Sequence, residues 1–309
     1  MIKIAFIGAG NMTTHHMKAF ASINSVQITG IYSKTIEKAN QLSSLYPTCK
    51  VYNTIEDLYN DTKSDLVVIS VPELATETIC IECFKYPWKC LVEKPIGYNL
   101  EIANIINEEA LKYNRDVYVA FNRRHYASTR NLLLELNKTN ETRYIHIYDQ
   151  ENPNAALLSG QPELVVKNWM YANSIHLIDF VLLLGRGNIK NIINIIPLID
   201  NYILTKIEFD SGDIVIYECI WNAPAPWSVV VNTKNKRWEM RPIEKLFFQD
   251  FTSRQLQEFE LDDLDIIYKP GLKVQAEEML KVIRGEKNNM PKIKHALDTM
   301  QIINKIYNN

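Results

Sequence analysis

A buried strand followed at once by a glycine-rich turn and a helix constrains the fold of this chain more than any other feature. The chain opens with IKIAFIGAGNMTTHHMKAF, and five of the six residues in Ile2–Ile7 are apolar. Such a run suits a strand buried on both faces of a parallel sheet. Gly8 permits a tight turn, Gly10 lets a pyrophosphate approach the backbone, and the next helix offers unpaired N–H groups to that anion. The segment therefore predicts a dinucleotide site with Thr13 in place of the third glycine; the alternative is an ordinary strand–helix turn with two glycines.

Length and charge indicate a globular protein with a small-molecule partner. The chain has 309 residues, enough for two domains, and its 34 Lys plus Arg against 36 Asp plus Glu give a net charge of −2. The absence of long blocks of like charge argues against a nucleic-acid or membrane partner. We find no signal peptide and no apolar run near the roughly 20 residues of a spanning helix, so we expect a cytoplasmic protein.

The cysteines and the histidine pair do not suggest a disulfide framework or a metal site. Five cysteines occur without a secretion signal: Cys49, Cys80, Cys83, Cys90 and Cys219. The CxxC at Cys80 has no second CxxC or histidine cluster to complete a zinc site, so buried or half-buried thiols are favoured. His15-His16, in the first predicted helix, is interpreted as a solvated or packed pair, and no metal is expected.

Alternating strands and helices over the first 120 or so residues predict a parallel sheet covered on both faces. Further strands are expected at Gln27–Tyr32, Lys50–Tyr52, Asp65–Val71, Lys89–Glu93 and Asp116–Phe121. Helices are expected at Ile36–Leu45, after a capping pair of Thr54 and Asp57, and at Leu100–Tyr113. Ligands of such a sheet bind at the carboxyl ends of its strands.

The end of the second strand bears on the choice of cofactor. An NAD site usually has a carboxylate there, whereas this chain has Ser33-Lys34-Thr35 and no acidic residue before Glu37. An ammonium and two hydroxyls suit a 2′-phosphate, so NADP is favoured over NAD, with a solvated turn as the alternative.

Beyond Arg130 the alternation stops and a second domain is predicted. Strands are expected at Arg143–Tyr148, Tyr202–Phe209, Asp213–Trp221, Trp227–Val231 and Arg237–Arg241, and two closing helices at Val274–Arg284 and Ile293–Ile306. Their mixed alternation favours a largely antiparallel, open-faced sheet packed on helices. The fold class is therefore α/β, with a Rossmann domain at residues 1–122 and an α+β domain at residues 123–309.

Two motifs carry residues suited to alcohol chemistry. Glu93-Lys94-Pro95 follows a predicted strand, and its proline restricts Lys94 to extended geometry or a cis bond. A lysine there can hydrogen-bond a substrate hydroxyl, although a surface lysine is an equal alternative. In Asn173-Ser174-Ile175-His176-Leu177-Ile178-Asp179, either of the first two residues can cap a helix ending at Gly185, and His176 can exchange the proton of an alcohol.

Together these motifs resemble the glucose-fructose oxidoreductase, inositol dehydrogenase and MocA-like family over nearly the whole chain. The resemblance rests on the glycine motif, Val71-Pro72, the EKP of residues 93–95, Phe121-Asn122-Arg123-Arg124, the HxxD of His176 and Asp179, and the terminal helices. It implies that Lys94 and His176 act on a sugar or cyclitol hydroxyl and that Asp179 binds substrate. It also implies a homodimer or homotetramer formed through the open sheet face.

The remaining site residues are predicted from this combination of motifs. Substrate contacts are expected from Asn173, Arg123, Arg124 and Tyr171, where Arg123 and Arg124 clamp an anionic group or merely cap the sheet, and Tyr171, with Trp169, forms a stacking wall or core. Cofactor contacts are expected from Gly8, Gly10, Asn11, Met12, Ser33, Lys34, Thr35, Val71, Pro72, Glu93, Lys94 and Asn122.

One departure from the family pattern shapes the predicted activity. Many members have an aspartate four residues before the histidine, where this chain has Ala172. The predicted function is hydride transfer between NADP or NAD and a secondary alcohol or ketone of a sugar or nucleotide sugar. By analogy, enzymes of surface-polysaccharide pathways fit this departure best. A non-catalytic dinucleotide-binding regulator and a redox-neutral NAD-dependent glycosidase are the alternatives.

Overall fold

The computed structural model describes residues 1–195 and 201–307. The chain divides into two compact units, each with its own sheet. The first unit contains Met1–Asn122 and Ile266–Leu297, and the second contains Arg123–Asp265 and the chain from Asp298 onward.

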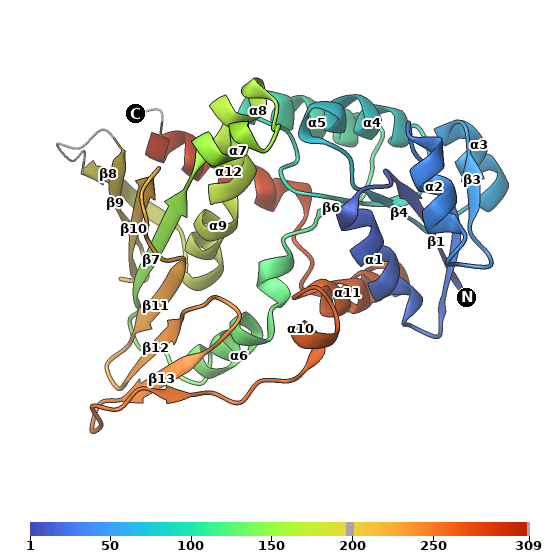
Figure 1. Ribbon diagram of the computed structural model, residues 1–309. Helices are drawn as coiled ribbons and strands as arrows, with labels where there is room; N and C mark the ends of the chain where they lie inside the picture. Colours follow the sequence, from blue (N-terminus) through green and yellow to red (C-terminus); the bar gives the residue numbers. More distant parts are fainter. Residues whose placement is uncertain (196–200, 308–309) are drawn as a thin grey trace. The chain divides into compact units, whose positions relative to one another are not determined.

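The first unit is built on a six-stranded parallel sheet (Figure 1). Its strands are β1 (Ile2–Ile7), β2 (Val26–Tyr32), β3 (Lys50–Tyr52), β4 (Leu66–Ile69), β5 (Lys89–Val92) and β6 (Val117–Val119). The order β3-β2-β1-β4-β5-β6, with every neighbouring pair parallel, is the Rossmann order. The predicted fold class of this part is confirmed. The central strands are the apolar runs that the sequence predicted, and β1 and β4 are buried over nearly their whole length.

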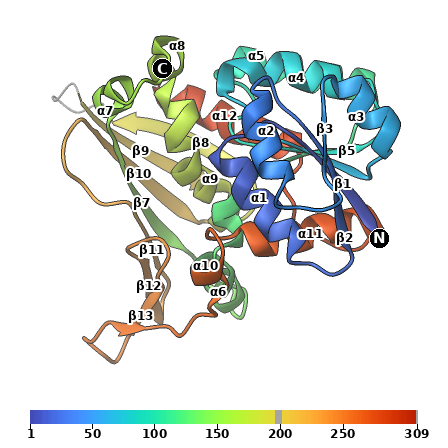
Figure 2. The same ribbon diagram turned by 45° about the vertical axis from the view of Figure 1, so that its right-hand side comes forward.

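Helices cover both faces of this sheet. They are α1 (Asn11–Ala21), α2 (Ile36–Ser43), α3 (Ile55–Thr62), α4 (Thr76–Cys83) after the short helix η1 (Glu73–Ala75), α5 (Leu100–Lys112) and α11 (Leu272–Arg284). Figures 1 and 2 show α4 and α5 on one face and α1 beside α11 on the other. Thr54 caps α3 as predicted, because its side chain accepts a hydrogen bond from the Asp57 N–H.

The segment 266–297 departs from the predicted domain division, which assigned it to the second domain. Leu272, Ala276 and Met279 of α11 join the core cluster of α1 and the sheet, which includes Phe20. The segment after α11 extends the sheet, since the Val119 N–H donates to the Pro291 carbonyl at 2.9 Å. The apolar face of α1 is therefore packed against residues that lie about 250 positions further along the chain.

The second unit is built on an eight-stranded, mostly antiparallel sheet. Its strands are β7 (Tyr144–Glu151), β8 (Ile189–Ile195), β9 (Tyr202–Phe209), β10 (Ile214–Trp221), β11 (Ser228–Asn232), β12 (Lys236–Met240), β13 (Phe247–Asp250) and β14 (Gln257–Glu258), in the order β14-β13-β12-β11-β7-β10-β9-β8. Among the described strand pairs of this second sheet, only β10 and β7 run parallel to each other. The predicted open-faced sheet is confirmed, but β8, β13 and β14 were not predicted, and β7 runs three residues beyond its predicted end.

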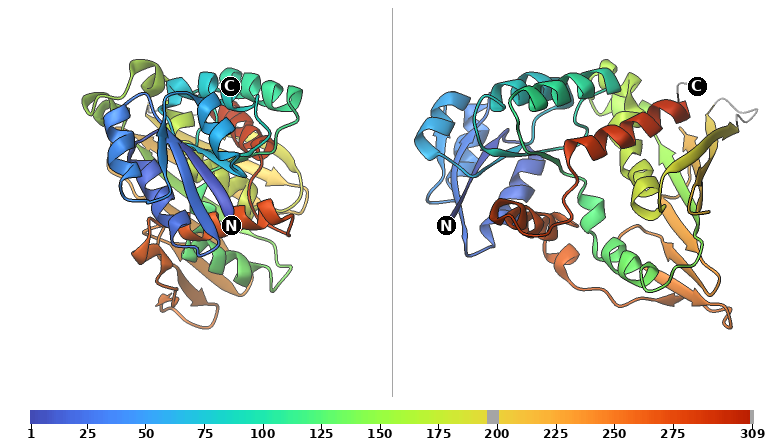
Figure 3. Two further views of the ribbon diagram at one scale, coloured as in Figure 1. Left: turned by 90° about the vertical axis from the view of Figure 1, so that its right-hand side faces the viewer. Right: turned by 180° about the vertical axis from the view of Figure 1, so that it is seen from behind.

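One face of this sheet is packed on helices, most directly on α9 (Ile175–Leu184) (Figure 3). The other helical elements are η2 (Asn122–His125), α6 (Ala127–Leu136), α7 (Pro153–Leu158), α8 (Glu163–Lys167), the π-helix η3 (Met170–Ser174), α10 (Leu264–Ile267) and α12 (Ile293–Tyr307). α9 ends at Gly185, as predicted, and a side chain on that glycine would collide with the Phe209 ring at 2.3 Å. The close approach of the Phe209 ring therefore requires a residue without a side chain at position 185.

The described residues contain neither a membrane-spanning helix nor a metal-binding cluster. No helix within residues 1–195 and 201–307 is long and apolar enough to cross a membrane. The same residues hold no group of three or more His, Cys, Asp or Glu side chains placed to bind a metal ion. All five cysteines are free and buried.

Candidate functional site

The first glycine of the turn is required by close packing of the backbone. Gly8 has φ +99°, and a Cβ built on it would lie 1.9 Å from the Ser70 carbonyl oxygen. The Ser70 N–H donates to the Ile7 carbonyl at 2.8 Å, which holds the ends of β4 and β1 together at this point. Any side chain here would force these two strand ends apart.

The second glycine leaves space beside the start of α1. A Cβ on Gly10 would meet no atom within 4 Å. Gly10 occupies the N-cap of α1 without a side-chain cap, and the first turn contains no acidic residue to complement the positive end of the helix dipole. These features fit the pyrophosphate of a dinucleotide, with Asn11 and Met12 beginning the helix. Thr13, at the position of the third glycine, is completely buried.

Ser33, Lys34 and Thr35 lie beside the glycine turn. The Gly8 N–H donates to the carbonyl of Tyr32, the last residue of β2, at 2.8 Å. The Ser33 hydroxyl accepts a hydrogen bond from the Thr35 N–H at 3.2 Å, while the Lys34 side chain is exposed. The strand end therefore presents an ammonium and hydroxyls.

The ends of β4 and β5 complete this edge of the sheet. Val71 and Pro72 follow β4, and the Glu93 N–H donates to the Ile69 carbonyl at 2.9 Å. Lys94 is half-buried, and its bond to Pro95 is cis.

The Glu93 carboxylate has a partner that the sequence did not reveal. His16 of α1 is 1% exposed, and its Nε2 lies 2.6 Å from Glu93 Oε1. His16 is thus a packed residue that joins α1 to the end of β5, and the expected cofactor contact of Glu93 stays a prediction. Asn122 is also engaged, because its Nδ2 donates to the Pro270 carbonyl at 3.1 Å.

In the second unit, His176 belongs to a partly exposed helical face. Trp169, Asn173 and His176 follow one another at spacings of four and three residues, and all three are half-buried within an otherwise largely buried stretch. The predicted cap is different in detail, because Ser174 occupies the N-cap of α9 without a side-chain cap bond. The π-helix η3 runs directly into α9, so backbone carbonyls of η3 take the place of a side-chain cap. The Ile175 N–H donates to the carbonyls of Asn173 and Met170.

Asp179 lies deeper in the same helix and forms a buried ion pair. Arg124 Nε donates to Asp179 Oδ2 at 2.5 Å and Nη2 to Oδ1 at 2.6 Å, with side chains 8% and 5% exposed. The Thr299 hydroxyl donates to Oδ1 at 3.1 Å. Both residues were predicted to contact substrate; their mutual pairing gives each of them a structural role, and the substrate contacts stay predictions.

Tyr171 occupies the core position that the sequence left open as an alternative. It is 3% exposed, and its hydroxyl donates to Asn304 Oδ1 at 3.3 Å. Trp169, by contrast, lines a cavity of about 330 Å³ together with Asn173. The structure therefore favours Trp169 over Tyr171 as a wall for a ligand.

Sequence reasoning missed two buried carboxyl groups beside that cavity. Asp149 and Glu151 lie on the inward face of β7 and are 0% and 1% exposed. Glu151 Oε2 accepts hydrogen bonds from Trp169 Nε1 at 2.6 Å and Asn173 Nδ2 at 2.9 Å. Glu151 also lines the cavity. Every second residue of β7 is buried, from Ile145 and Ile147 to Glu151, and this pattern in the sequence could have identified Glu151 as an inward-facing residue.

Burial changes the protonation of both carboxyl groups. Burial, and then repulsion from Asp149, raise the pKa of Glu151 to about 8, while its bonds to Asn173 and Trp169 oppose this. Burial also raises the pKa of Asp149, against hydrogen bonds from Tyr217, Ser174 and the Gln150 N–H. At neutral pH the Glu151 side chain is therefore mainly a neutral acid, able to donate as well as accept a hydrogen bond.

Taken together, the first unit has the sheet order and the glycine turn of a dinucleotide-binding protein, and the second carries a polar cavity beside the His176 face. Residues 2–121 match the model of the Gfo/Idh/MocA oxidoreductase family, described as an NAD-binding Rossmann fold. The match covers this first part of the chain, and the predicted resemblance to the family is confirmed.

Three comparisons with known proteins agree with this assignment. Glucose-6-phosphate 3-dehydrogenase of Bacillus subtilis is 28% identical over 141 residues, 46% of this chain and 39% of the relative. Inositol 2-dehydrogenase 1 of Mycolicibacterium vanbaalenii is 27% identical over 125 residues, 40% of this chain and 36% of the relative. The structure of UDP-N-acetylglucosamine 3-dehydrogenase from Acidithiobacillus ferrooxidans has a TM-score of 0.78 at 14% identity, covering 99% of this chain and 96% of that one.

The matches differ in what they cover. The chain spans less than two fifths of the length of each curated relative. The solved structure covers both units, and at its low identity it demonstrates a shared fold.

Proposed function

We propose that this protein is an NAD(P)-dependent oxidoreductase that transfers a hydride to or from a secondary hydroxyl carbon of a sugar or nucleotide sugar. The observation that carries the proposal is the carboxyl edge of the first sheet. There Lys94 lies two residues beyond the end of β5, and the open start of α1 at Gly10 lies along the same edge. The names of the sugar and inositol dehydrogenases among its relatives support the substrate class.

The roles of the chain's own residues follow from alcohol chemistry. A bound nicotinamide supplies the hydride acceptor or donor at its C4. When hydride leaves the carbon, the hydroxyl proton must be removed and the developing oxygen charge stabilised. We assign the proton to His176 and the oxygen to the Lys94 ammonium, and the proposal requires both groups to act on one hydroxyl.

Replacing Lys94 or His176 tests these roles. Lys94→Ala and His176→Asn should each lower kcat about 100-fold or more, because a positioned acid or base contributes at least that factor. The Kd of the cofactor should stay within about two-fold of wild type. Lys85→Ala, at an exposed lysine of the first unit, is the control. Unchanged kcat in Lys94→Ala would reject the assignment.

The assay also separates the two alternatives. Turnover is followed by nicotinamide absorbance with a panel of sugars and nucleotide sugars. A regulator would bind the dinucleotide without any absorbance change or product. A redox-neutral glycosidase would release a leaving group without net change in absorbance.

We further propose that NADP is preferred over NAD. The exposed Lys34 ammonium and the hydroxyls beside it can bind a 2′-phosphate. Lys34→Ala should weaken NADP binding about tenfold and leave NAD binding unchanged, as measured by cofactor titration. Tighter binding of NAD than of NADP by the wild type would contradict this proposal.

A further inference from the structure

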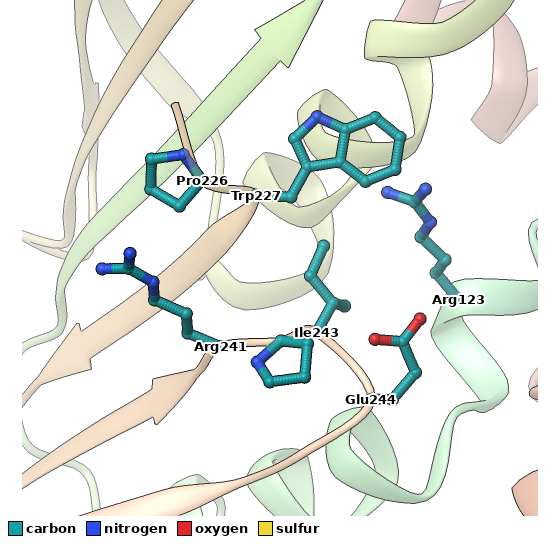
Figure 4. Close-up of a pocket in the computed structure, with 7 residues that line it drawn as sticks. Arg123, Pro226, Trp227, Arg241, Ile243 and Glu244 are labelled. Atoms are coloured by element: carbon teal, nitrogen blue, oxygen red, sulfur yellow. The ribbon is translucent and has the colours of Figure 1, made fainter. Parts of the chain in front are cut away.

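Two cavities of the second unit share one wall, the side chain of Trp227. The arginine cavity, of about 500 Å³, is lined by Arg123, Pro226, Trp227, Arg241, Ile243 and Glu244, besides Pro242 (Figure 4). The glutamate cavity, of about 330 Å³, includes Glu151, Trp169, Asn173, Gln150, Gln161 and Trp227. The Trp227 Nε1 donates to the Gln150 carbonyl at 2.7 Å, which fixes the indole between them.

Arg123 supplies the strongest sign of a ligand in the arginine cavity. Its guanidinium carbon lies 4.3 Å from the centre of the Trp227 ring, a cation–π contact. Its Nη1 is buried and has no hydrogen-bond partner among the described residues. Because arginine stays protonated in proteins, this is a buried, charged donor without an acceptor, which an anionic ligand would satisfy.

The other charges around Arg123 leave room for an added anion. Burial lowers the pKa of Arg123, and the Tyr126 hydroxyl, which also hydrogen-bonds the guanidinium, opposes this together with the carboxyl groups of Asp149 and Glu244. Asp149 itself is completely buried, and burial raises its pKa. Figure 4 shows Glu244 on the Arg123 side of the cavity and Arg241 on the other side of Ile243. The charged residues that line the cavity are Arg123, Arg241 and Glu244, so its lining carries a net positive charge.

The glutamate cavity has a different chemistry. Glu151, Asn173 and Gln150 provide carboxyl and amide groups that can donate and accept hydrogen bonds. Trp169 and Trp227 provide flat apolar surfaces. Hydroxyl groups on a carbon ring match this combination, since the polar groups bind the hydroxyls and the indoles pack against the ring's C–H face.

We propose that the arginine cavity binds an anionic group of the substrate, a phosphate or a carboxylate, and that the glutamate cavity beside it holds the substrate's hydroxylated ring. The inference rests on the proposed function, and it narrows the substrate class to anionic sugars. The proposed substrate of this chain is therefore charged, unlike the neutral inositol for which one of its relatives is named.

The test compares matched probes on the whole protein with cofactor. Glucose, glucose 6-phosphate, glucuronate and UDP-N-acetylglucosamine differ in the presence and kind of the anionic group. We expect kcat/KM for at least one anionic probe to exceed that for glucose by tenfold or more. Phosphate and carboxylate sources are told apart by which probe is preferred.

Arg241→Gln locates the effect in the arginine cavity. Arg241 is exposed, so its replacement should not disturb folding. It should raise KM for the preferred anionic probe tenfold or more and lower kcat/KM for glucose far less, so that the preference for the anionic probe is lost. Arg241→Lys should retain part of the effect, and Arg254→Gln, at another exposed arginine of the second unit, should match the wild type.

Binding measured by calorimetry without cofactor separates failure of this inference from failure of the proposed function. If no sugar changes nicotinamide absorbance but the anionic probes bind, and Arg241→Gln weakens that binding, the anion site stands and the oxidoreductase proposal falls. If glucose binds as tightly as every anionic probe, or Arg241→Gln leaves each Kd unchanged, the anion site is overturned.

Discussion

The two units form their candidate sites in different ways. In the first unit, the turn at Gly8, the Ser33 segment and Lys94 each lie within two residues of the end of a strand, and the parallel sheet brings these strand ends to one edge. In the second unit, Glu151, Asn173 and Trp227 come from a strand, a π-helix and the segment before β11, and side-chain burial brings them together. The first site depends on backbone geometry, and the second depends on packing and on compensated buried charge.

The largest effect is expected where the backbone of the first unit is tightest. In Gly8→Ala, the added methyl would meet the Ser70 carbonyl at 1.9 Å at a positive φ. The combined overpacking and backbone strain should lower the free energy of unfolding by about 3 kcal/mol or more, as measured by urea denaturation. Gly10→Ala is the matched control, because its methyl meets no atom within 4 Å, and it should unfold like wild type while binding dinucleotide more weakly. Equal stability of Gly8→Ala and wild type would contradict the packing argument.

An effect of similar size is expected from the buried ion pair of the second unit. Asp179→Ala leaves the Arg124 guanidinium buried without its carboxylate, which should cost about 3–5 kcal/mol if Arg124 cannot reach water and less if it can. The exposed pair of Lys85 and Glu82 in the first unit is the comparison, and Lys85→Ala should leave the stability close to that of wild type. If Asp179→Ala and Lys85→Ala lowered the free energy of unfolding by similar amounts, burial would not increase the contribution of an ion pair to stability.

The protonation of Glu151 gives an intermediate effect that depends on pH. Its pKa is about 8 when folded, above the usual 4.5, so between these values the folded chain holds a proton that the unfolded chain has lost. The free energy of unfolding should therefore fall as pH rises from 5 to 8. Glu151→Gln, which resembles the protonated acid and does not titrate, should gain about 1–3 kcal/mol relative to wild type over that range. Glu163→Gln, at an exposed site on α8, is the control, and parallel stability curves for Glu151→Gln and wild type would exclude the raised pKa.

The smallest effect is expected from a helix cap in the first unit. Thr54→Ala removes the hydrogen bond from the Asp57 N–H at 2.9 Å and should lower stability by about 1 kcal/mol. Thr35→Ala removes a threonine at the N-cap of α2 that makes no such bond, so its stability should stay close to wild type. A larger loss in Thr35→Ala than in Thr54→Ala would reverse the expected order.

The first site could be predicted because its information is local in the sequence. The run before Gly8, the turn itself and the polar residues after β2 lie within the first 35 residues. The Thr54 cap and the strand before Lys94 are equally local. The pairing of His16 with Glu93 was not predictable in this way, because it joins residues 77 positions apart.

The second site could be predicted only in part. His176 and Asn173 were found from a short motif, but β7 was expected to end at Tyr148, three residues before its end at Glu151. The strand continues because the carboxyl groups of Asp149 and Glu151 meet partners from distant elements. Tyr217 donates to Asp149 at 2.8 Å, and Trp169 and Asn173 bind Glu151. A linear pattern does not contain those partners.

The return of residues 266–297 to the first sheet limits how this protein can be dissected. A recombinant fragment that stops at Asn122 would expose the apolar flank of Phe20 and Met17, which Leu272, Ala276 and Met279 cover in the intact chain. Such a fragment should aggregate during purification unless α11 is supplied, either fused through a short linker or added as a peptide. Expression trials of the isolated nucleotide-binding half should therefore start from a version carrying that graft.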